Sequence, residues 1–152
     1  MKILVISDTH GDINLVNQVL LANSDCDLAI HCGDICANPS LFYGNLLIVK
    51  GNCDFFSNFP SSRDIVVADK KIHIEHGNRY GALDTKNIEK LNCDIFLFGH
   101  THCKYVQKLN NTYIFNPGSL VRPRDGSEGT YLIINIDDKT KKINFKFKEV
   151  DL

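Results

Sequence analysis

Five short segments of the sequence carry side chains that bind first-row metal ions. They are Asp8-Thr9-His10, Gly33-Asp34, Gly51-Asn52, His76-Gly77 and Gly99-His100-Thr101-His102. Together these segments offer two carboxylates, four imidazoles and one carboxamide. Imidazole and carboxylate groups are ligands for Mn, Fe, Ni or Zn, and no thiolate is required. Seven such residues exceed what one tetrahedral zinc ion needs, so the set suits two ions that share a carboxylate.

The spacing within these segments also favours metal chemistry. Asp8 and His10, like His100 and His102, are two residues apart, which puts both side chains on one face of a strand or lets a turn clasp an ion. Two ions about 3.5–4 Å apart polarise a phosphoryl oxygen and lower the pKa of a water between them. A Gly-Asp or Gly-Asn pair alone is an ordinary turn. The joint occurrence of all five segments therefore carries the prediction of metal-assisted phosphoryl chemistry.

Each segment follows a short apolar run that is typical of a buried strand. The runs cover residues 2–7, 28–31, 46–49, 71–75 and 94–98. In layered α/β folds, the ligand crevice lies outside the carboxyl ends of the strands. We therefore expect the five segments to converge on one place, where their glycines permit tight backbone turns.

The remaining pattern predicts a mixed α/β chain. Asp12 is a candidate N-cap for a helix that ends near Asn23, and Asp84 for a short helix that ends near Leu91. Further strands are expected over residues 64–68, 104–109, 112–115, 130–136 and 142–149. No repeat, low-complexity tract or linker divides the chain, so residues 1–152 are predicted to form a single domain.

Composition excludes several functional classes. The chain has 43% hydrophobic and 23% charged residues and a net charge of -1, without the basic run expected of a protein that binds long nucleic acid. No stretch approaches the roughly 20 apolar residues that span a bilayer, and the apolar run at the N-terminus is too short for a secretory signal. The six cysteines form no C-x-x-C pair. Free thiols in the cytoplasm are the simpler interpretation, with three disulfides in a secreted protein as the alternative.

The ordered series Asp-x-His, Gly-Asp, Gly-Asn, His-Gly and Gly-His-x-His resembles that of the calcineurin-like metallophosphoesterase superfamily. Within it, Gly51-Asn52-Cys53-Asp54 and Asn116-Pro117-Gly118-Ser119 are similar to the small prokaryotic YfcE-type phosphodiesterases. Residues 116–119 are expected to form a turn behind the site. The resemblance covers residues 7–124 and implies a metallophosphoesterase fold. This fold is a four-layer α-β-β-α sandwich of two mixed sheets flanked by helices, with a dinuclear site at one edge.

The resemblance also implies roles for the seven residues. Asp8, His10 and His102 would bind the first metal ion, and Asp34 would bridge the two. Asn52, His76 and His100 would complete the second, and Asn52 would also act in catalysis by contacting a substrate phosphate oxygen. The nucleophile would be a metal-bridging hydroxide. Mn is the expected metal, with Ni, Fe, Zn and Co as the alternatives that these ligands suit.

Two positions depart from the pattern of many superfamily members. Cys53 and Asn78 stand where relatives often have histidine. Both are expected to line the substrate site. A neutral thiol is a poor general acid, because an unperturbed cysteine titrates near pH 8.5. The leaving-group proton would then come from Asp54, a metal-bound water or the substrate itself, or the enzyme would favour good leaving groups.

Other residues near these motifs have weaker interpretations. His31 and His73 lie inside apolar strands and are predicted to be packed or hydrogen-bonded, with His31 as a candidate to orient a ligand. Arg79, Arg122 and Arg124 are candidates for phosphate contacts or for plain loop positions. Three phenylalanines follow Asn52, and core packing, a rim for an apolar or nucleoside group, and a subunit contact all stay open for them. They are Phe55, Phe56 and Phe59.

The predicted function is hydrolysis of a small phosphodiester by a metal-dependent phosphodiesterase. Phosphomonoesterase or pyrophosphatase action is the alternative within enzymes, since the same metal chemistry serves both. A non-catalytic protein-interaction scaffold of the same fold is the alternative from another class. Neither long nucleic acid nor a membrane is an expected partner. Self-association into a homo-oligomer stays open.

Overall fold

The strands near the N-terminus are almost wholly apolar because both of their faces are covered. In the computed structural model, which describes residues 1–55, 57–78 and 84–150, they are β1 (Lys2–Ile6), β2 (Leu28–His31) and β3 (Leu46–Ile48). These three pair in parallel, and β1 also pairs antiparallel with β9 (Thr130–Ile136). The strand β10 (Ile143–Glu149) completes a mixed sheet with the order β10-β9-β1-β2-β3.

A second mixed sheet is built from the middle of the chain. Its order is β4-β5-β6-β8-β7. The strands are β4 (Ser62–Val67), β5 (Lys70–Glu75), β6 (Ile95–Leu97), β7 (Lys104–Leu109) and β8 (Thr112–Pro117). The parallel pairs are β5 with β6 and β6 with β8, and antiparallel strands lie at both edges. Asn116 and Pro117, which we expected in a turn, instead finish β8 and pair with β7.

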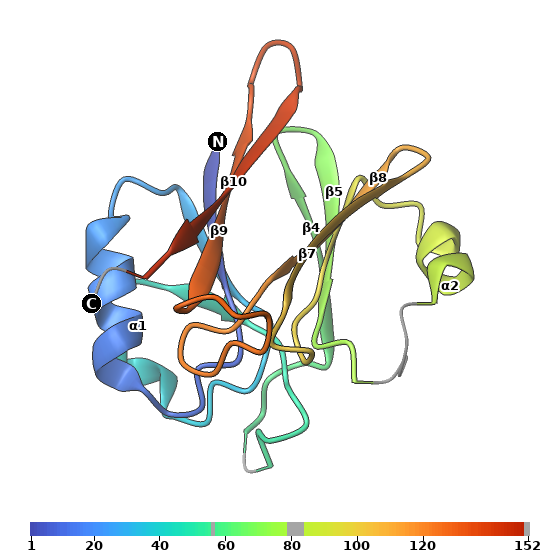
Figure 1. Cartoon of the computed structure of the whole chain (residues 1–152). Coiled ribbons are helices and arrows are strands. Elements are labelled where there is room, and N and C mark those ends of the chain that lie inside the picture. The colour runs from blue at the N-terminus through green and yellow to red at the C-terminus, as the bar shows by residue number, and fades with distance from the viewer. Residues whose placement is uncertain (56, 79–83, 151–152) are drawn as a thin grey trace.

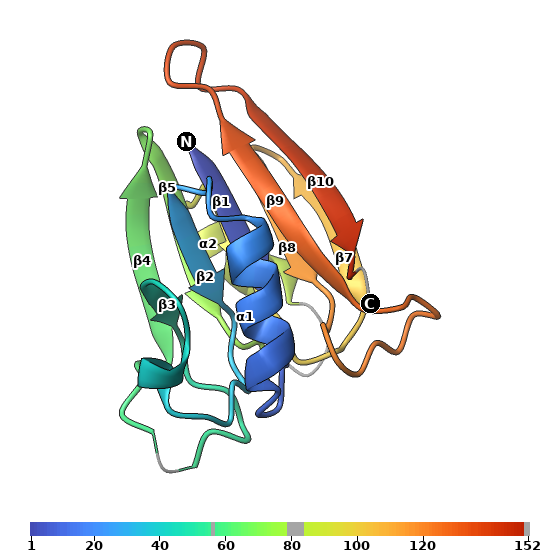
Figure 2. The same ribbon diagram turned by 90° about the vertical axis from the view of Figure 1, so that its left-hand side faces the viewer.

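The two sheets pack face to face, and a helix covers the outer face of each (Figures 1 and 2). Residues such as Val5, Ile30, Ile74, Leu97 and Leu132 form the core between the sheets. The helix α1 (Ile13–Ala22) packs on the first sheet, and α2 (Thr85–Lys90) on the second. These layers confirm the four-layer α-β-β-α prediction.

The predicted helix caps are present. The Asp12 carboxylate accepts a hydrogen bond from the backbone N–H of Leu15, and Asp84 accepts one from that of Asn87. A carboxylate at this position satisfies an amide that has no partner inside the helix. A short 3-10 helix, η1 (Pro39–Leu41), lies between β2 and β3. Within the described part of the chain, no helix is both long and apolar enough to cross a membrane.

Candidate metal centre

The five predicted segments lie at the carboxyl ends of strands from both sheets. Asp8 and His10 follow β1, Asp34 follows β2 and Asn52 follows β3. His76 follows β5, and both His100 and His102 follow β6. The structure brings all seven side chains to one place, as the strand pattern predicted. Their role as metal ligands stays a prediction.

Backbone hydrogen bonds join the turns after β1 and β2. The N–H groups of Asp8, His10 and Gly11 donate to the carbonyls of Gly33, Asp34 and Ile35, at 3.0, 2.9 and 2.9 Å. Five of the seven predicted ligands have positive φ, a region that costs a non-glycine residue about 1–2 kcal/mol. They are Asp8, His10, Asp34, His100 and His102. Such strain persists where the surroundings enforce it, and it clusters at functional sites.

One half of the centre is formed by Asp8, His10 and His102. His102 Nε2 lies 3.4 Å from Asp8 Oδ1 and 3.3 Å from His10 Nε2. One ligand atom from each of the three residues lies within 4.8 Å of the others. These are the residues that the family resemblance assigned to the first metal ion.

The other half contains His76, His100 and Asn52, with Asp34 between the halves. His76 Nε2 lies 3.3 Å from Asp34 Oδ2, and His10 Nε2 lies 4.0 Å from the same oxygen. His100 Nδ1 lies 3.3 Å from Asn52 Oδ1. Burial raises the pKa of the Asp34 carboxyl, but the nearby His76 and the Cys53 backbone N–H lower it more, to about 2. Asp34 is therefore a carboxylate that faces histidines from both halves.

Two buried atoms of the centre have the surroundings that metal ligands need. Asp8 Oδ1 and His76 Nε2 have no hydrogen-bond partner among the described residues. Asp8 Oδ2 accepts from the Ser7 hydroxyl at 2.6 Å and the His100 N–H at 3.0 Å, and His76 Nδ1 donates to the Cys32 carbonyl at 2.8 Å. A buried polar atom without a partner is costly, whereas a metal ligand needs one free lone pair and a braced second atom. The residues present therefore fit a metal.

Residues 116–122 hold the centre from behind. The Ser119 hydroxyl donates to the Asp8 carbonyl at 2.8 Å and accepts from the backbone N–H of Arg122 at 2.9 Å. His102 Nδ1 donates to the Arg122 carbonyl at 2.8 Å, which leaves Nε2 toward the centre. Asn116 Nδ2 donates to the Gly99 carbonyl at 2.9 Å. Residues 116–119 were predicted to lie behind the site, but the individual contacts have no signal in the sequence.

Two further buried side chains hold the turns. His31 Nδ1 accepts from the Gly33 N–H at 3.1 Å, and Nε2 lies 2.9 Å from the Thr9 hydroxyl. Burial lowers the pKa of His31 to about 4, so it is neutral and packed, as its apolar strand indicated. Asp54 accepts three backbone N–H bonds, from Asp34, Cys36 and Gly51. Both Asp54 oxygens therefore hold these turns in place, and the suggestion of Asp54 as a proton source stays a prediction.

Glycines at two strand ends let the side chains of predicted metal ligands approach the backbone closely. A Cβ on Gly51 would collide with the Asp34 carboxylate, and one on Gly99 would collide with Ser7 Oγ and Asp8 Oδ2. Neither glycine has positive φ. These two glycines leave room for the neighbouring side chain. The sequence pattern had instead suggested that they permit tight backbone turns.

The predicted substrate residues lie around the centre. Asn52 is exposed, and its Nδ2 lies 3.9 Å from Cys53 Sγ. Burial raises the pKa of the Cys53 thiol, so it is neutral near pH 7. Asn78 lines a pocket of about 240 Å³ together with Asn52 and His76. Phe56 and Arg79 lie outside the described residues.

Two mixed sheets that bring imidazoles and carboxylates together at strand ends are the features of a metal-dependent phosphoesterase. Comparison with known families agrees. Residues 1–139 match the model of the calcineurin-like phosphoesterase superfamily domain, and the chain belongs to this family.

Individual relatives extend over nearly the whole chain. The probable metallophosphoesterase YsnB of Bacillus subtilis (strain 168) is 31% identical over 154 residues, covering 95% of this chain and 90% of YsnB. The phosphodiesterase YfcE of Escherichia coli (strain K12) is 25% identical over 166 residues, covering 90% of this chain and 89% of YfcE. The crystal structure of a predicted phosphoesterase from Streptococcus pneumoniae TIGR4 aligns with a TM-score of 0.82 at 28% identity, covering 99% of this chain and 92% of that chain.

Proposed function

We propose that this chain is a phosphodiesterase that hydrolyses a P–O bond of a small phosphodiester with two divalent metal ions. The observation that carries the proposal is the pair of buried atoms, Asp8 Oδ1 and His76 Nε2, that face the centre without a hydrogen-bond partner in the described chain. The name of the relative YfcE supports the choice of a diester.

The residues divide between two ions. Asp8, His10 and His102 would hold one, Asn52, His76 and His100 the other, and Asp34 would contact both. Two bound ions would polarise the phosphoryl group and activate water near neutral pH. Mn²⁺ is our first choice, because imidazole, carboxylate and amide ligands together suit ions between the hard and soft extremes.

The protein's own groups position the substrate and limit the leaving groups. The exposed Asn52 amide, beside His100, would donate a hydrogen bond to a phosphate oxygen. Cys53 is a neutral thiol whose backbone N–H donates to Asp34 Oδ1 at 2.9 Å. Because no imidazole stands there to protonate the leaving oxygen, aryl esters should react faster than alkyl esters.

The test is hydrolysis of bis(4-nitrophenyl) phosphate by the purified protein with added Mn²⁺. Asp34→Asn and His100→Ala should each abolish turnover. Asp69→Asn is the matched control, because its side chain is 81% exposed in the β4–β5 turn, and it should keep wild-type turnover within about twofold. Full activity in both centre variants would contradict the proposal.

Two results would favour an alternative function over the phosphodiesterase. Faster hydrolysis of 4-nitrophenyl phosphate or pyrophosphate than of the diester would favour the monoesterase or pyrophosphatase alternative. A protein that takes up no metal after incubation with Mn²⁺ and has no activity would favour the scaffold.

We also propose that the chain works in a reducing compartment, the cytoplasm. All six cysteines are free in the structure, and disulfides are rare where thiols are kept reduced.

A further inference from the structure

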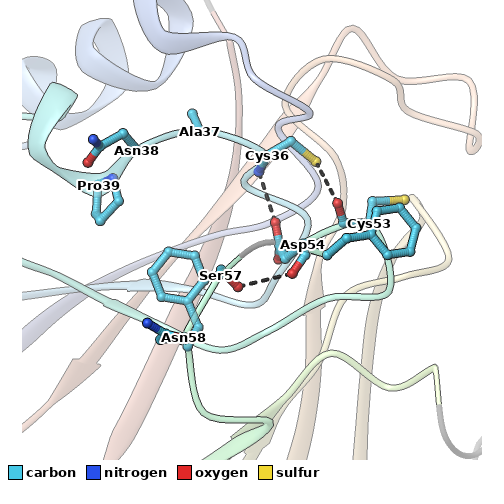
Figure 3. A pocket seen from close by; sticks show the side chains of 10 residues that line it. Cys36, Ala37, Asn38, Pro39, Cys53, Asp54, Ser57 and Asn58 are labelled. Atoms are coloured by element: carbon cyan, nitrogen blue, oxygen red, sulfur yellow. Dashed lines mark hydrogen bonds between the residues drawn. The ribbon is translucent and has the colours of Figure 1, made fainter.

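A pocket of about 750 Å³ opens beside the metal centre, between the segment after β2 and the segment after β3. Cys36, Asn38 and Pro39 line it from the first segment, and Cys53, Asp54 and Asn58 from the second (Figure 3). Figure 3 shows Asn38 and Pro39 at one end of the pocket and Cys36, Cys53 and Asp54 at the other. Its volume lies within the range of small-molecule sites, about 300–1,000 Å³.

Two cysteines that line the pocket lie next to residues of the centre. Cys36 Sγ lies 4.0 Å from His10 Nδ1 and 3.8 Å from the Cys53 carbonyl oxygen. Cys53 lies in a group with His10 and Asp34 whose ligand atoms are all within 4.8 Å of one another. A phosphodiester carries two organic groups. When its phosphate is at the centre, one of them is therefore close enough to enter the pocket.

The lining suits a flat, neutral group with polar edges. Pro39, Phe55 and Phe59 supply apolar surface, and Phe55 is 75% exposed. Asn38 and Asn58 add carboxamides, which both donate and accept hydrogen bonds.

Charge narrows the choice further. Asp54 is the one charged residue among the described residues that line the pocket, and its oxygens accept three backbone N–H bonds. A cationic or anionic head group would therefore gain little binding energy in the pocket. An acyl chain would make no hydrogen bonds to the carboxamides of Asn38 and Asn58.

We propose that this pocket binds the nucleobase of a nucleoside phosphodiester whose phosphate lies at the metal centre. The proposal rests on the phosphodiesterase function above and names its substrate class. Phe55 stacks on the base, since stacking on an aromatic ring tolerates any base. Carboxamides pair with base edges, as Asn and Gln do with adenine.

Two substrates with the same leaving group test the pocket. They are thymidine 5′-(4-nitrophenyl phosphate) and methyl 4-nitrophenyl phosphate, which differ only in the group that would enter it. Phe55→Ala should lower kcat/KM for the thymidine ester about tenfold or more, mainly through KM, because it removes base stacking. The methyl ester should change less than about twofold. Phe55→Tyr should restore the rate on the thymidine ester. Tyr43→Ala, at a position 57% exposed and outside the pocket lining, is the matched control.

The outcomes separate the pocket from the proposed function. An equal loss on both substrates, or no loss on either, would overturn the pocket assignment while leaving the phosphodiesterase intact. If the wild type hydrolyses neither ester, the proposed function fails, and calorimetric titration with thymidine 5′-monophosphate and Mn²⁺ then decides. About tenfold weaker binding by Phe55→Ala would support the pocket, and equal or undetectable binding to both proteins would overturn it.

Discussion

Two buried histidines with carboxylates beside them lie at the end of β5, and they use their ring nitrogens in opposite ways. In the metal centre, the Nδ1–H of His76 donates to the Cys32 carbonyl, and Nε2 has no hydrogen-bond partner among the described residues. Three residues earlier, His73 Nδ1 lies 2.7 Å from Asp64 Oδ1 and Nε2 lies 2.7 Å from Glu75 Oε1. The His73 ring also stacks on Phe96 at 5.4 Å.

The comparison shows that burial of histidine beside a carboxylate does not by itself identify a metal ligand. A ligand needs a lone pair that the protein leaves unused, with its other ring nitrogen braced. His76 meets both conditions. His73 fails the first, since both of its nitrogens already bond to carboxylates and neither keeps an unused lone pair. This agrees with the prediction that His73, which lies inside an apolar strand, is packed or hydrogen-bonded.

The largest loss of metal binding and turnover should follow from removing His76, whose Nε2 has no hydrogen-bond partner among the described residues. His76→Ala should lower the bound metal from two ions to one per chain and reduce turnover by about 10³-fold or more, since metal polarisation is worth several kcal/mol. Metal content by mass spectrometry and the hydrolysis rate measure this. His73→Gln is the control and should keep the wild-type metal content and turnover. Two bound ions in His76→Ala would contradict the assignment of His76 as a metal ligand.

A histidine introduced at position 53, at the rim of the centre, tests whether this position can protonate the leaving group. Cys53→His should accelerate hydrolysis of diesters with alkyl leaving groups by about 10²-fold, because an imidazolium can protonate the leaving oxygen. Diesters with aryl leaving groups should change much less. Rates across a series of leaving groups measure the difference, with Cys53→Ser as the control. Equal acceleration of both classes would argue against a role in proton transfer.

A smaller effect is expected where the centre is braced from behind. Ser119→Ala removes the hydrogen bond to the Asp8 carbonyl. Because outer partners of metal ligands typically contribute 10–100-fold, the Mn²⁺ dissociation constant should rise by about that factor. Mn²⁺ titration of activity measures it, with the exposed Ser24→Ala as the control. An unchanged dissociation constant would show that the turn holds its shape without this bond.

The smallest effect concerns His73 and depends on pH. Burial lowers the pKa of His73, but its hydrogen bonds to Glu75 and Asp64 raise it more, so the net shift is upward. A raised pKa in the folded state stabilises the protein fully below the unfolded value of about 6.5, and the contribution is lost as pH rises through the folded pKa.

The free energy of unfolding of wild type minus that of His73→Gln should therefore be larger at pH 5.5 than at pH 9. Urea titrations of the metal-free proteins measure this difference. A difference that stays flat or grows with pH would contradict the sign of the shift.

Much of the fold was predictable because local patterns agree with the tertiary structure. The apolar runs, the caps Asp12 and Asp84, and the polar segments at strand ends all correspond to observed features. The family resemblance supplied the four layers. The division of the chain into a single domain, the roles of Cys53 and Asn78 in binding substrate, and self-association stay predictions.

Other features depend on contacts between distant residues. The hydroxyl of Ser119 reaches the Asp8 carbonyl across 111 positions of sequence, and the His100 N–H reaches the Asp8 carboxylate across 92. Asp54 accepts hydrogen bonds from three backbone amides, two of which are 18 and 20 positions away in the sequence, so its structural role could not be read from the sequence.

By itself, the sequence determined which donor types are available and at which strand ends they stand, because strand periodicity and residue chemistry are local properties. Only the tertiary structure decided which atom of each donor is left free. That choice depends on partners from the other sheet, such as the Cys32 carbonyl beside His76 and the His100 N–H beside the Asp8 carboxylate. The left-handed turns at Asp8, His10 and Asp34 were decided in the same way, because the strain of each is offset by hydrogen bonds between neighbouring turns.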